Sequence, residues 1–239
     1  VLALMRDHPA DLGLKPFGRT APLPAPEPQK SLTAMLASPL VTLREVSNTA
    51  TFWVLFLTFF VCGFSTNGLI QTHWITLCGD YGIAPVGAAG ILAVIGCFDL
   101  VGTIMSGWLS DRFDNRWLLF WFYCLRGLSL IYLTFTDFSV YELAPFAVFY
   151  GLDWVATVPP TVKLAAERFG AEKAGLVFGW IFTGHQIGAA AAAGFAGLVR
   201  TDYDSYMPAL VLAGAFCLAA SLMVFVIGRP APRAALLAS

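Results

Sequence analysis

Six long apolar segments follow one another in this 239-residue chain, and they constrain its fold more than any other feature. A helix needs about 20 residues to cross the hydrocarbon core of a bilayer, and backbone groups inside lipid must be paired within the protein. The segments do not alternate polar and apolar residues as the strands of a membrane barrel do. They predict transmembrane helices at 50–77, 85–109, 117–136, 140–162, 174–199 and 206–228.

The small number of charged residues points the same way. Charged residues make up 12% of the chain and hydrophobic residues 58%, whereas a globular domain carries about 25% charged residues. A soluble protein of this size would need more charge to cover its surface. We therefore expect an all-α membrane protein. Its net charge of −1 gives no indication of nucleic acid as a partner.

Lysine and arginine are concentrated in alternate connections between the predicted spans. Five lie between residues 6 and 49, and others lie in the connections after the second and fourth spans and in the tail. The connections at 78–84 and 137–140 contain none, and 200–205 contains only Arg200. By the positive-inside rule, both ends of the six-span bundle are expected in the cytoplasm.

The segment before the first span differs in composition from the rest of the chain. Prolines alternate at Pro22, Pro24, Pro26 and Pro28, a pattern typical of an extended linker. We expect residues 1–49 to include this cytoplasmic linker, with a short surface helix at 31–46, and residues 229–239 to form a cytoplasmic tail. Because the chain begins with Val1 rather than methionine, we expect it to be part of a longer protein.

Motifs for metal binding or catalysis are missing from the sequence. The five cysteines are far apart and form no CxxC pair, and neither HExxH nor a nucleophile elbow occurs. We expect no metal, no cofactor and no enzymatic activity. Two alternatives to transport stay open, a six-helix intramembrane enzyme and a non-transporting membrane receptor or scaffold.

The connection after the second predicted span carries the most informative motif. It has the pattern G-x-x-x-D-R-x-x-x-R, formed by Gly107, Asp111, Arg112 and Arg116. This resembles the signature loop of the major facilitator superfamily, G-x-x-x-D-R-x-G-R-R, although the two residues before Arg116 depart from its Gly and Arg. The loop also falls where the family has it, between the second and third helices of a six-helix half.

The resemblance implies a fold and an activity. The six spans would form the carboxy-terminal half of a major facilitator fold, with residues 1–4 ending the sixth helix of an amino-terminal half. The segment 98–102 is similar to the eighth helix of monocarboxylate and oxalate/formate porters, although Thr103 stands where monocarboxylate transporters carry arginine. The implied protein is a secondary transporter of a small anionic organic solute, working by alternating access with proton symport in a bacterial inner membrane.

Four ionisable residues lie well inside the predicted spans: Asp99, Arg126, Asp153 and His185. A charge buried in lipid costs several kcal/mol, so each requires a partner or a water-filled cavity. At 1.5 Å per residue they lie about 15–18 Å from the cytoplasmic ends of their spans. Secondary transporters bind solutes and coupling ions at this depth.

These residues allow more than one pairing. Arg126 could form an ion pair with Asp99 or with Asp153, and such a pair could serve transport or merely hold helices in register. In the functional interpretation Arg126 holds a substrate carboxylate, while Asp99 or His185 takes up a proton. Asn67 and Gln71 on the first span would line the outer part of the pathway, or belong to an interfacial belt.

The signature loop is interpreted as a conformational latch. Asp111 would accept hydrogen bonds from the N-terminus of a neighbouring helix, and Arg112 and Arg116 would pair with acids or lipid phosphates. The alternative is that the basic residues only keep the loop in the cytoplasm. Pro159 and Pro160 must break or kink the fourth span, which would produce either a gating bend or a simple helix end.

Small residues recur in the fifth predicted span at intervals of about four positions, at Gly175, Gly179, Gly184 and Gly188. Small residues at this spacing let two helices approach closely in a membrane. We therefore expect this span to contact a neighbouring helix closely.

Overall fold

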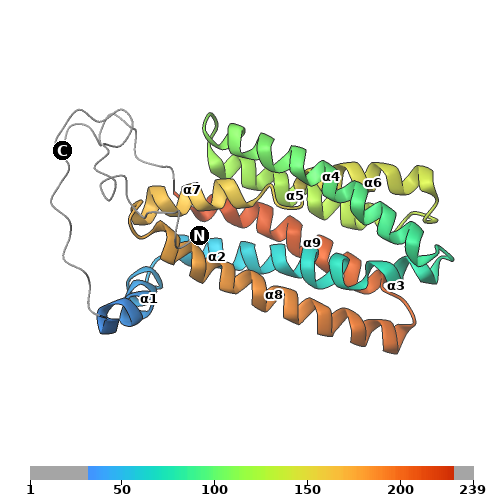
Figure 1. The fold of residues 1–239 in the computed structure, drawn as a ribbon, viewed down its shortest axis with the longest axis horizontal. Coiled ribbons are helices and arrows are strands. Elements are labelled where there is room, and N and C mark those ends of the chain that lie inside the picture. Colours follow the sequence, from blue (N-terminus) through green and yellow to red (C-terminus); the bar gives the residue numbers. More distant parts are fainter. Residues whose placement is uncertain (1–31, 229–239) are drawn as a thin grey trace, which may run out of the picture. The chain divides into compact units, whose positions relative to one another are not determined.

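The computed structural model of the protein describes residues 32–228, and every regular element in that range is a helix. Figure 1 labels the α-helices. The elements in chain order are α1 (Leu32–Val46), α2 (Ala50–Gly63), the π-helix η2 (Phe64–Gln71), α3 (Thr72–Asp80), α4 (Pro85–Ser110), α5 (Asn115–Leu133), α6 (Val140–Asp153), α7 (Val158–Phe169), α8 (Ala174–Tyr203), α9 (Met207–Met223) and the short 3-10 helix η3 (Val224–Val226). The proline-rich part of the expected linker and the expected tail lie outside the described residues.

Each predicted span contains helix, but the helices differ in length. Among the described residues, four helices are long and apolar enough to cross a membrane, at Ala50–Asp80, Pro85–Ser110, Ala174–Tyr203 and Met207–Val226. The third predicted span corresponds to α5, which has 19 residues. The fourth is divided into α6 and α7, so the number of complete membrane crossings stays a prediction.

The break in the fourth predicted span lies earlier than its proline pair. Residues 154–157 leave the helix, and Pro159 and Pro160 then occupy the first turn of α7. Proline is favoured there because the first amide groups of a helix have no intrahelical acceptor. The prolines therefore start the second helical piece instead of kinking a continuous one.

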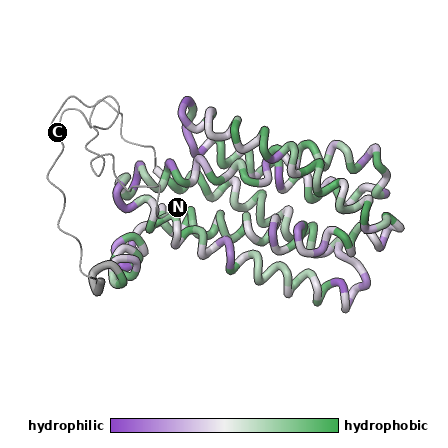
Figure 2. Tube along the Cα trace, in the orientation of Figure 1, coloured by the Kyte–Doolittle hydropathy of each residue, from purple (hydrophilic) through white to green (hydrophobic). Residues whose placement is uncertain are grey.

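The first long helix lies at the centre of the bundle. Within the unit formed by the residues from Pro39 onward, α2 and η2 pack against α8 and also against α9. Helix α5 packs on α9 and α6, and α4 packs on α6. Figure 2 shows apolar residues along most of these helices, with hydrophilic residues near the helix ends and also at a few places in the middle of the bundle.

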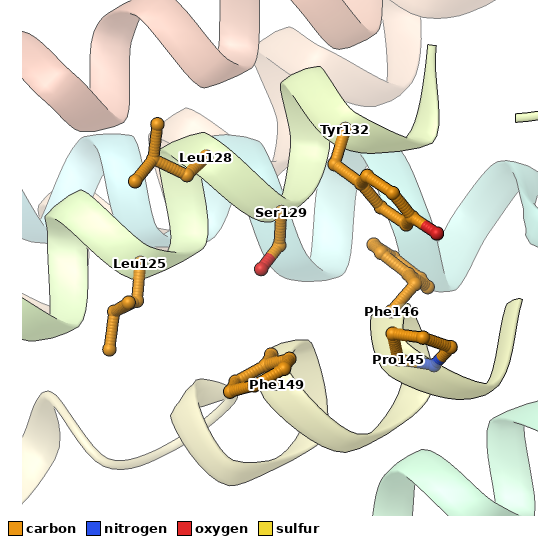
Figure 3. A pocket seen from close by; sticks show the side chains of 7 residues that line it. All are labelled: Leu125, Leu128, Ser129, Tyr132, Pro145, Phe146 and Phe149. Atoms are coloured by element: carbon orange, nitrogen blue, oxygen red, sulfur yellow. The ribbon is translucent and has the colours of Figure 1, made fainter. Parts of the chain in front are cut away.

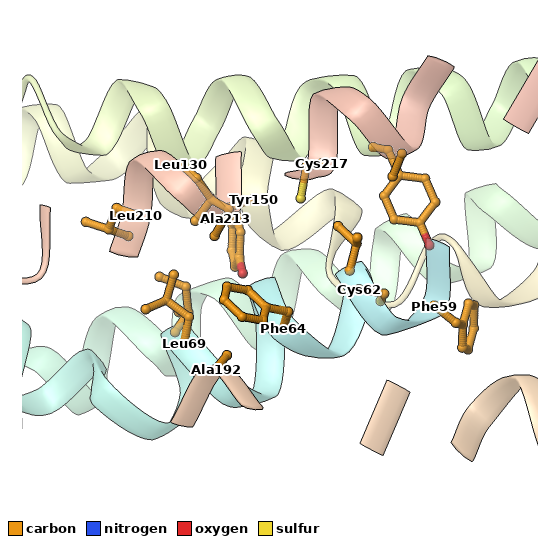
Figure 4. Packing of buried hydrophobic residues seen from close by; sticks show 14 of the residues in the cluster. Phe59, Cys62, Phe64, Leu69, Leu130, Tyr150, Ala192, Leu210, Ala213 and Cys217 are labelled. Carbon is orange, nitrogen blue, oxygen red and sulfur yellow. The ribbon is translucent and has the colours of Figure 1, made fainter. Parts of the chain in front are cut away.

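Apolar side chains from α2 and η2 fill the space between these layers. Phe59, Phe64 and Leu69 are almost fully buried and face residues of α5, α6, α8 and α9 (Figure 4). Tyrosine hydroxyls pair with carbonyls of the same central helix: Tyr123 on α5 donates to Thr58 O at 2.8 Å, and Tyr150 on α6 donates to Ser65 O at 2.6 Å. Buried polar tips are thus paired, as an apolar core requires.

Close contact between α2 and α8 depends on glycine. A Cβ added at Gly184 or Gly188 would lie less than 3.0 Å from a backbone oxygen of α2. The two earlier glycines of α8, Gly175 and Gly179, have no such neighbour among the described residues. The expected close approach is therefore formed by the second pair.

The central helix widens in its middle. The π-helix η2 covers Phe64–Gln71 and contains Asn67. Hydroxyl groups accompany the irregular turns: Ser65 Oγ donates to Val61 O at 2.8 Å, and Thr72 Oγ1 donates to Asn67 O at 2.7 Å. Such π-helical turns are rare and often occur at functional sites.

Candidate functional site

The break between α6 and α7 is the centre of the candidate site. Non-helical backbone at membrane depth is tolerated only where protein groups or water satisfy its hydrogen bonds. Side chains from α5, α4 and α2 reach residues 153–157 from different sides. The site is therefore built from segments that are distant in the sequence.

Arg126 on α5 supplies most of these hydrogen bonds. Its side chain is fully buried, and its Nε lies 2.7 Å from Asp153 Oδ2. Its Nη2 donates to Asp153 O at 2.5 Å and to Trp154 O at 3.1 Å. One guanidinium thus pairs a buried carboxylate and binds two carbonyls at the end of α6. Of the two pairings that the sequence allows, the structure contains the one with Asp153.

Asp99 on α4 binds the opposite side of the break. Its Oδ1 accepts a hydrogen bond from Val155 N at 2.9 Å and one from Thr103 Oγ1 at 3.2 Å. Two turns after Asp99 on the same helix, Ser106 Oγ donates to Ala156 O at 2.5 Å. Asp99 therefore caps a backbone amide instead of pairing directly with Arg126.

Close packing brings α4 to this position. A Cβ at Gly102 would lie less than 3.0 Å from Leu152 O, so only glycine allows α4 to approach α6 so closely. This approach puts Asp99 and Ser106, on either side of Gly102, within reach of the break. The absence of a side chain at Gly102 is thus a structural requirement of the site.

Cys62 on α2 is a member of the site that the sequence did not reveal. Arg126 Nη1 donates to its sulfur at 3.0 Å, and its sulfur lies 3.6 Å from Thr157 Oγ1. Cysteines inside apolar segments are usually packing residues. The position of Cys62 along its predicted span could have indicated this role, because Cys62 lies about 18 Å from residue 50 and so near the middle of the membrane.

His185 on α8 lies at the edge of the same cluster. It is 8% exposed, and its ring stacks on Phe182 with centroids 5.1 Å apart. In the described part of the chain, His185 Nδ1 and Asp153 Oδ1 are buried without a hydrogen-bond partner. Three of the four predicted midplane charges thus meet at the break, and the backbone of His185 lies against Gly63, the residue that follows Cys62.

Asn67 and Gln71 are separate from this cluster. Asn67 is half-buried within the π-helix and Gln71 is exposed. The neighbouring His73 joins helices: its Nδ1 lies 3.2 Å from Tyr206 Oη and its Nε2 3.0 Å from Ala193 O. No metal-binding group of three His, Cys, Asp or Glu residues occurs among residues 32–228.

The signature loop contacts α7 through its aspartate. Lys163 Nζ lies 3.0 Å from Asp111 Oδ1 and donates to Ser110 O at 2.5 Å. Asp111 therefore pairs with a lysine, whereas the sequence suggested a helix N-terminus. Arg112 lies over the ring of Trp108, 4.1 Å from its centroid.

Arg116 is the buried member of the loop. Its Nε donates to Asp114 Oδ1 at 3.0 Å, and its Nη1 donates to Ile227 O at 3.0 Å, after the end of α9. Gly107 contributes no close contact, since an added Cβ would meet no described atom within 4 Å. The loop is thus connected to α7 by one ion pair and to the end of the bundle by Arg116.

The two basic contacts should differ in their contribution to stability. Lys163→Gln removes an exposed ion pair and should cost about 0–1 kcal/mol. Arg116→Gln removes charged hydrogen bonds from a side chain that is 8% exposed, and should cost about 1.5–3 kcal/mol. Unfolding of both variants in detergent, followed by tryptophan fluorescence, would measure the difference. Equal losses would contradict the contrast in burial.

A profile described as Major Facilitator Superfamily matches this chain over residues 2–193 and 55–238. The chain is 29% identical over 159 residues to the "Uncharacterized MFS-type transporter YcxA" of Bacillus subtilis, a match that covers 64% of the chain and 38% of that protein. It is 32% identical over 152 residues to "Monocarboxylate transporter 13" of Rattus norvegicus, covering 62% and 35%.

A third similar protein is the "Probable galactarate/D-glucarate transporter GudP" of Escherichia coli, 24% identical over 138 residues. That match covers 55% of the chain and 31% of the transporter. The chain thus matches about a third of the length of each of these relatives.

Proposed function

Because the chain belongs to the Major Facilitator Superfamily, we propose that it forms the carboxy-terminal six-helix half of a secondary active transporter. In this proposal the six spans have both ends in the cytoplasm, in a bacterial inner membrane, and an amino-terminal half completes the pathway. The coverage of the relatives supports it, since the matches extend over about a third of their length. The apolar helices support insertion in a bilayer.

The solute we propose is a small organic anion of the carboxylate class. Two of the relatives are named for the transport of monocarboxylates and of galactarate or D-glucarate, and all of these solutes carry carboxylates. The sequence similarity of 98–102 to monocarboxylate porters supports the same class. We propose alternating access as the mode of transport, and the family membership supports it.

The observation that carries the proposal is the interrupted helix with its charged side chains. Discontinuous helices near the midplane are where secondary transporters build solute and ion sites. Four donor interactions of Arg126 are with protein groups. We therefore assign Arg126 to holding the α6–α7 break, in place of direct contact with the solute.

A proton is the coupling ion that the charges favour. Arg126 brings one positive charge, whereas Asp99 and Asp153 bring two negative charges when both are ionised. One proton would make this group neutral, which lowers the cost of burying it in a membrane. Asp99 is the better acceptor, because it is half-buried and Arg126 is already paired with Asp153.

Uptake measurements test the function directly. The whole protein that contains this chain would be reconstituted in proteoliposomes and supplied with labelled mono- and dicarboxylates, with and without an inward proton gradient. We expect saturable uptake of at least one carboxylate, accelerated by the gradient. Folded, correctly inserted protein that moves none of them would contradict the proposal, and gradient-independent uptake would contradict the coupling.

Asp99→Asn should separate coupling from binding. The asparagine amide does not ionise, so it cannot take up a proton on one side of the membrane and release it on the other. Uptake driven by the gradient should therefore fall by about 5–150-fold, the factor that corresponds to typical coupling free energies. Exchange of solute across preloaded vesicles, which needs no net proton movement, should persist. Thr103→Val is the matched control, since it removes a hydrogen bond to Asp99 but keeps the carboxylate. Gradient-driven uptake at the original rate in Asp99→Asn would rule out this role.

A further inference from the structure

A groove runs between α5 and α6 on the surface of the bundle. Its volume is about 410 Å³, which lies within the range of small-molecule sites, about 300–1,000 Å³. Figure 3 shows leucines of α5 on one wall, Phe149 of α6 on the other and Ser129 between them. Leu128 and Phe149 are more than half exposed, so packing within the described unit leaves these walls open.

Ser129 places a polar group in this apolar groove. The residue is 8% exposed and lines the groove between the apolar walls. A hydroxyl in apolar surroundings is stabilised when a ligand supplies an acceptor for it. Ser129 lies four residues, about 6 Å, before the end of α5 at Leu133. That depth is close to the boundary between hydrocarbon and headgroups, whose layer is about 5–8 Å thick on each side.

Two acidic residues lie near one end of the groove. Tyr132, which lines it, donates its hydroxyl to the backbone oxygen of Glu142 at 3.1 Å. Glu142 is in the first turn of α6, and its Oε2 accepts a hydrogen bond from the backbone amide of Asp137 at 2.8 Å, so the two acidic residues are neighbours. The connection 134–139 contains no lysine or arginine. This end of the groove therefore favours a positively charged group and repels an anion.

We propose that the groove binds one acyl chain of a phospholipid with an ammonium headgroup, such as phosphatidylethanolamine. The acyl chain lies against Leu125, Leu128 and Phe149, its ester carbonyl accepts a hydrogen bond from Ser129, and its ammonium group lies near Asp137 and Glu142. The acyl chain, the ester and the ammonium group of the lipid thus each lie against protein groups of matching polarity. The site does not depend on transport, and it is separate from the charged residues around the α6–α7 break.

Bound lipid can be measured by mass spectrometry. The whole protein that contains this chain would be placed in nanodiscs with equal amounts of phosphatidylethanolamine and phosphatidylglycerol, then extracted in mild detergent. We expect retained phosphatidylethanolamine in clear excess over phosphatidylglycerol. Leu128→Trp fills the groove and should abolish the excess. Leu222→Trp, at another exposed leucine, which lies on α9, is the matched control and should keep it.

Two milder variants test the polar contacts without filling the groove. Ser129→Ala should reduce retention of phosphatidylethanolamine, and Asp137→Asn should reduce the preference for it without changing retention of phosphatidylglycerol. Gel filtration and thermal unfolding would establish that each variant is folded. If Leu128→Trp does not fold, the lipid retention of Ser129→Ala and Asp137→Asn decides between the outcomes. A lipid ratio equal to that of the nanodisc, or an excess unchanged in all three groove variants, would mean annular lipid only and would overturn the proposal. Protection of the groove by a second protein chain would overturn it as well.

Discussion

Replacing Arg126 by leucine should destabilise the protein by about 3–5 kcal/mol, the loss typical of removing one partner from a buried ion pair. The substitution leaves the Asp153 carboxylate charged in an apolar interior. It also removes the donor for Asp153 O and Trp154 O, which lie where the helix is interrupted. Unfolding in detergent, followed by tryptophan fluorescence, would give the change in the free energy of unfolding.

Arg126→Lys distinguishes charge from hydrogen-bond geometry. Lysine keeps the positive charge, but its ammonium is a single point of donors and cannot reproduce the planar fork of arginine. It should therefore recover the pairing with Asp153 and lose part of the contacts with the two carbonyls and with Cys62. We expect a stability between those of the leucine variant and the original protein.

The double variant Arg126→Leu with Asp153→Leu completes the test. Removing both charges should restore part of the stability, because replacing a buried pair by apolar residues is far less harmful than breaking it. The recovery should be incomplete, since the carbonyls at the break still lack the arginine. Full stability in Arg126→Lys would show that charge alone matters, and full stability in Arg126→Leu would contradict the clamp altogether.

Replacing Gly188 by alanine should cost about 1–3 kcal/mol, as overpacking in a well-packed interior does. The new Cβ would lie less than 3.0 Å from Phe60 O, and backbone on both sides leaves little room to adjust. The contact between α8 and α2 must then widen. Because α2 also carries Cys62 and α8 carries His185, this widening should disturb the candidate site.

Gly194→Ala is the matched control on the same helix. A Cβ there meets no described atom within 4 Å, and alanine in a helix is more favourable than glycine by about 0.5–1 kcal/mol. We expect this variant to be as stable as the original protein or slightly more so. Thermal unfolding of both variants side by side would measure the contrast. Equal behaviour of the two variants would contradict the close approach at Gly188.

Much of the local structure could be predicted from the sequence because it depends on neighbouring residues. The apolar runs indicated helices, Pro159 and Pro160 marked an interruption, and the depth of Arg126 and Asp153 indicated that they needed partners. The location of the interruption was less accessible. Residues 154–157 leave the helix because α4 and α5 offer donors and acceptors to their backbone, and those helices are remote in the sequence.

The loop after α4 illustrates the same limit on another scale. Its spacing of Gly107, Asp111 and Arg116 identified the family resemblance, but the pattern did not give the partners. Asp111 pairs with Lys163, 52 residues later. Arg116 reaches Ile227, 111 residues later. From the charges in the sequence alone, Asp111 and Arg116 could pair with many other residues equally well.

By itself the sequence determined that the chain is apolar and helical, that charges lie at a common depth, and that its signature loop resembles one family. A bilayer responds to the length and polarity of each segment, so these properties add up along the chain. The tertiary structure alone decided that Arg126 pairs with Asp153, 27 residues away, that it contacts Cys62, 64 residues away, and that Asp99 caps Val155, 56 residues away. The physical reason is that a hydrogen bond depends on the distance and direction between its atoms. Both are fixed by the packing of the helices, which approach one another closely where glycine lies at the contact.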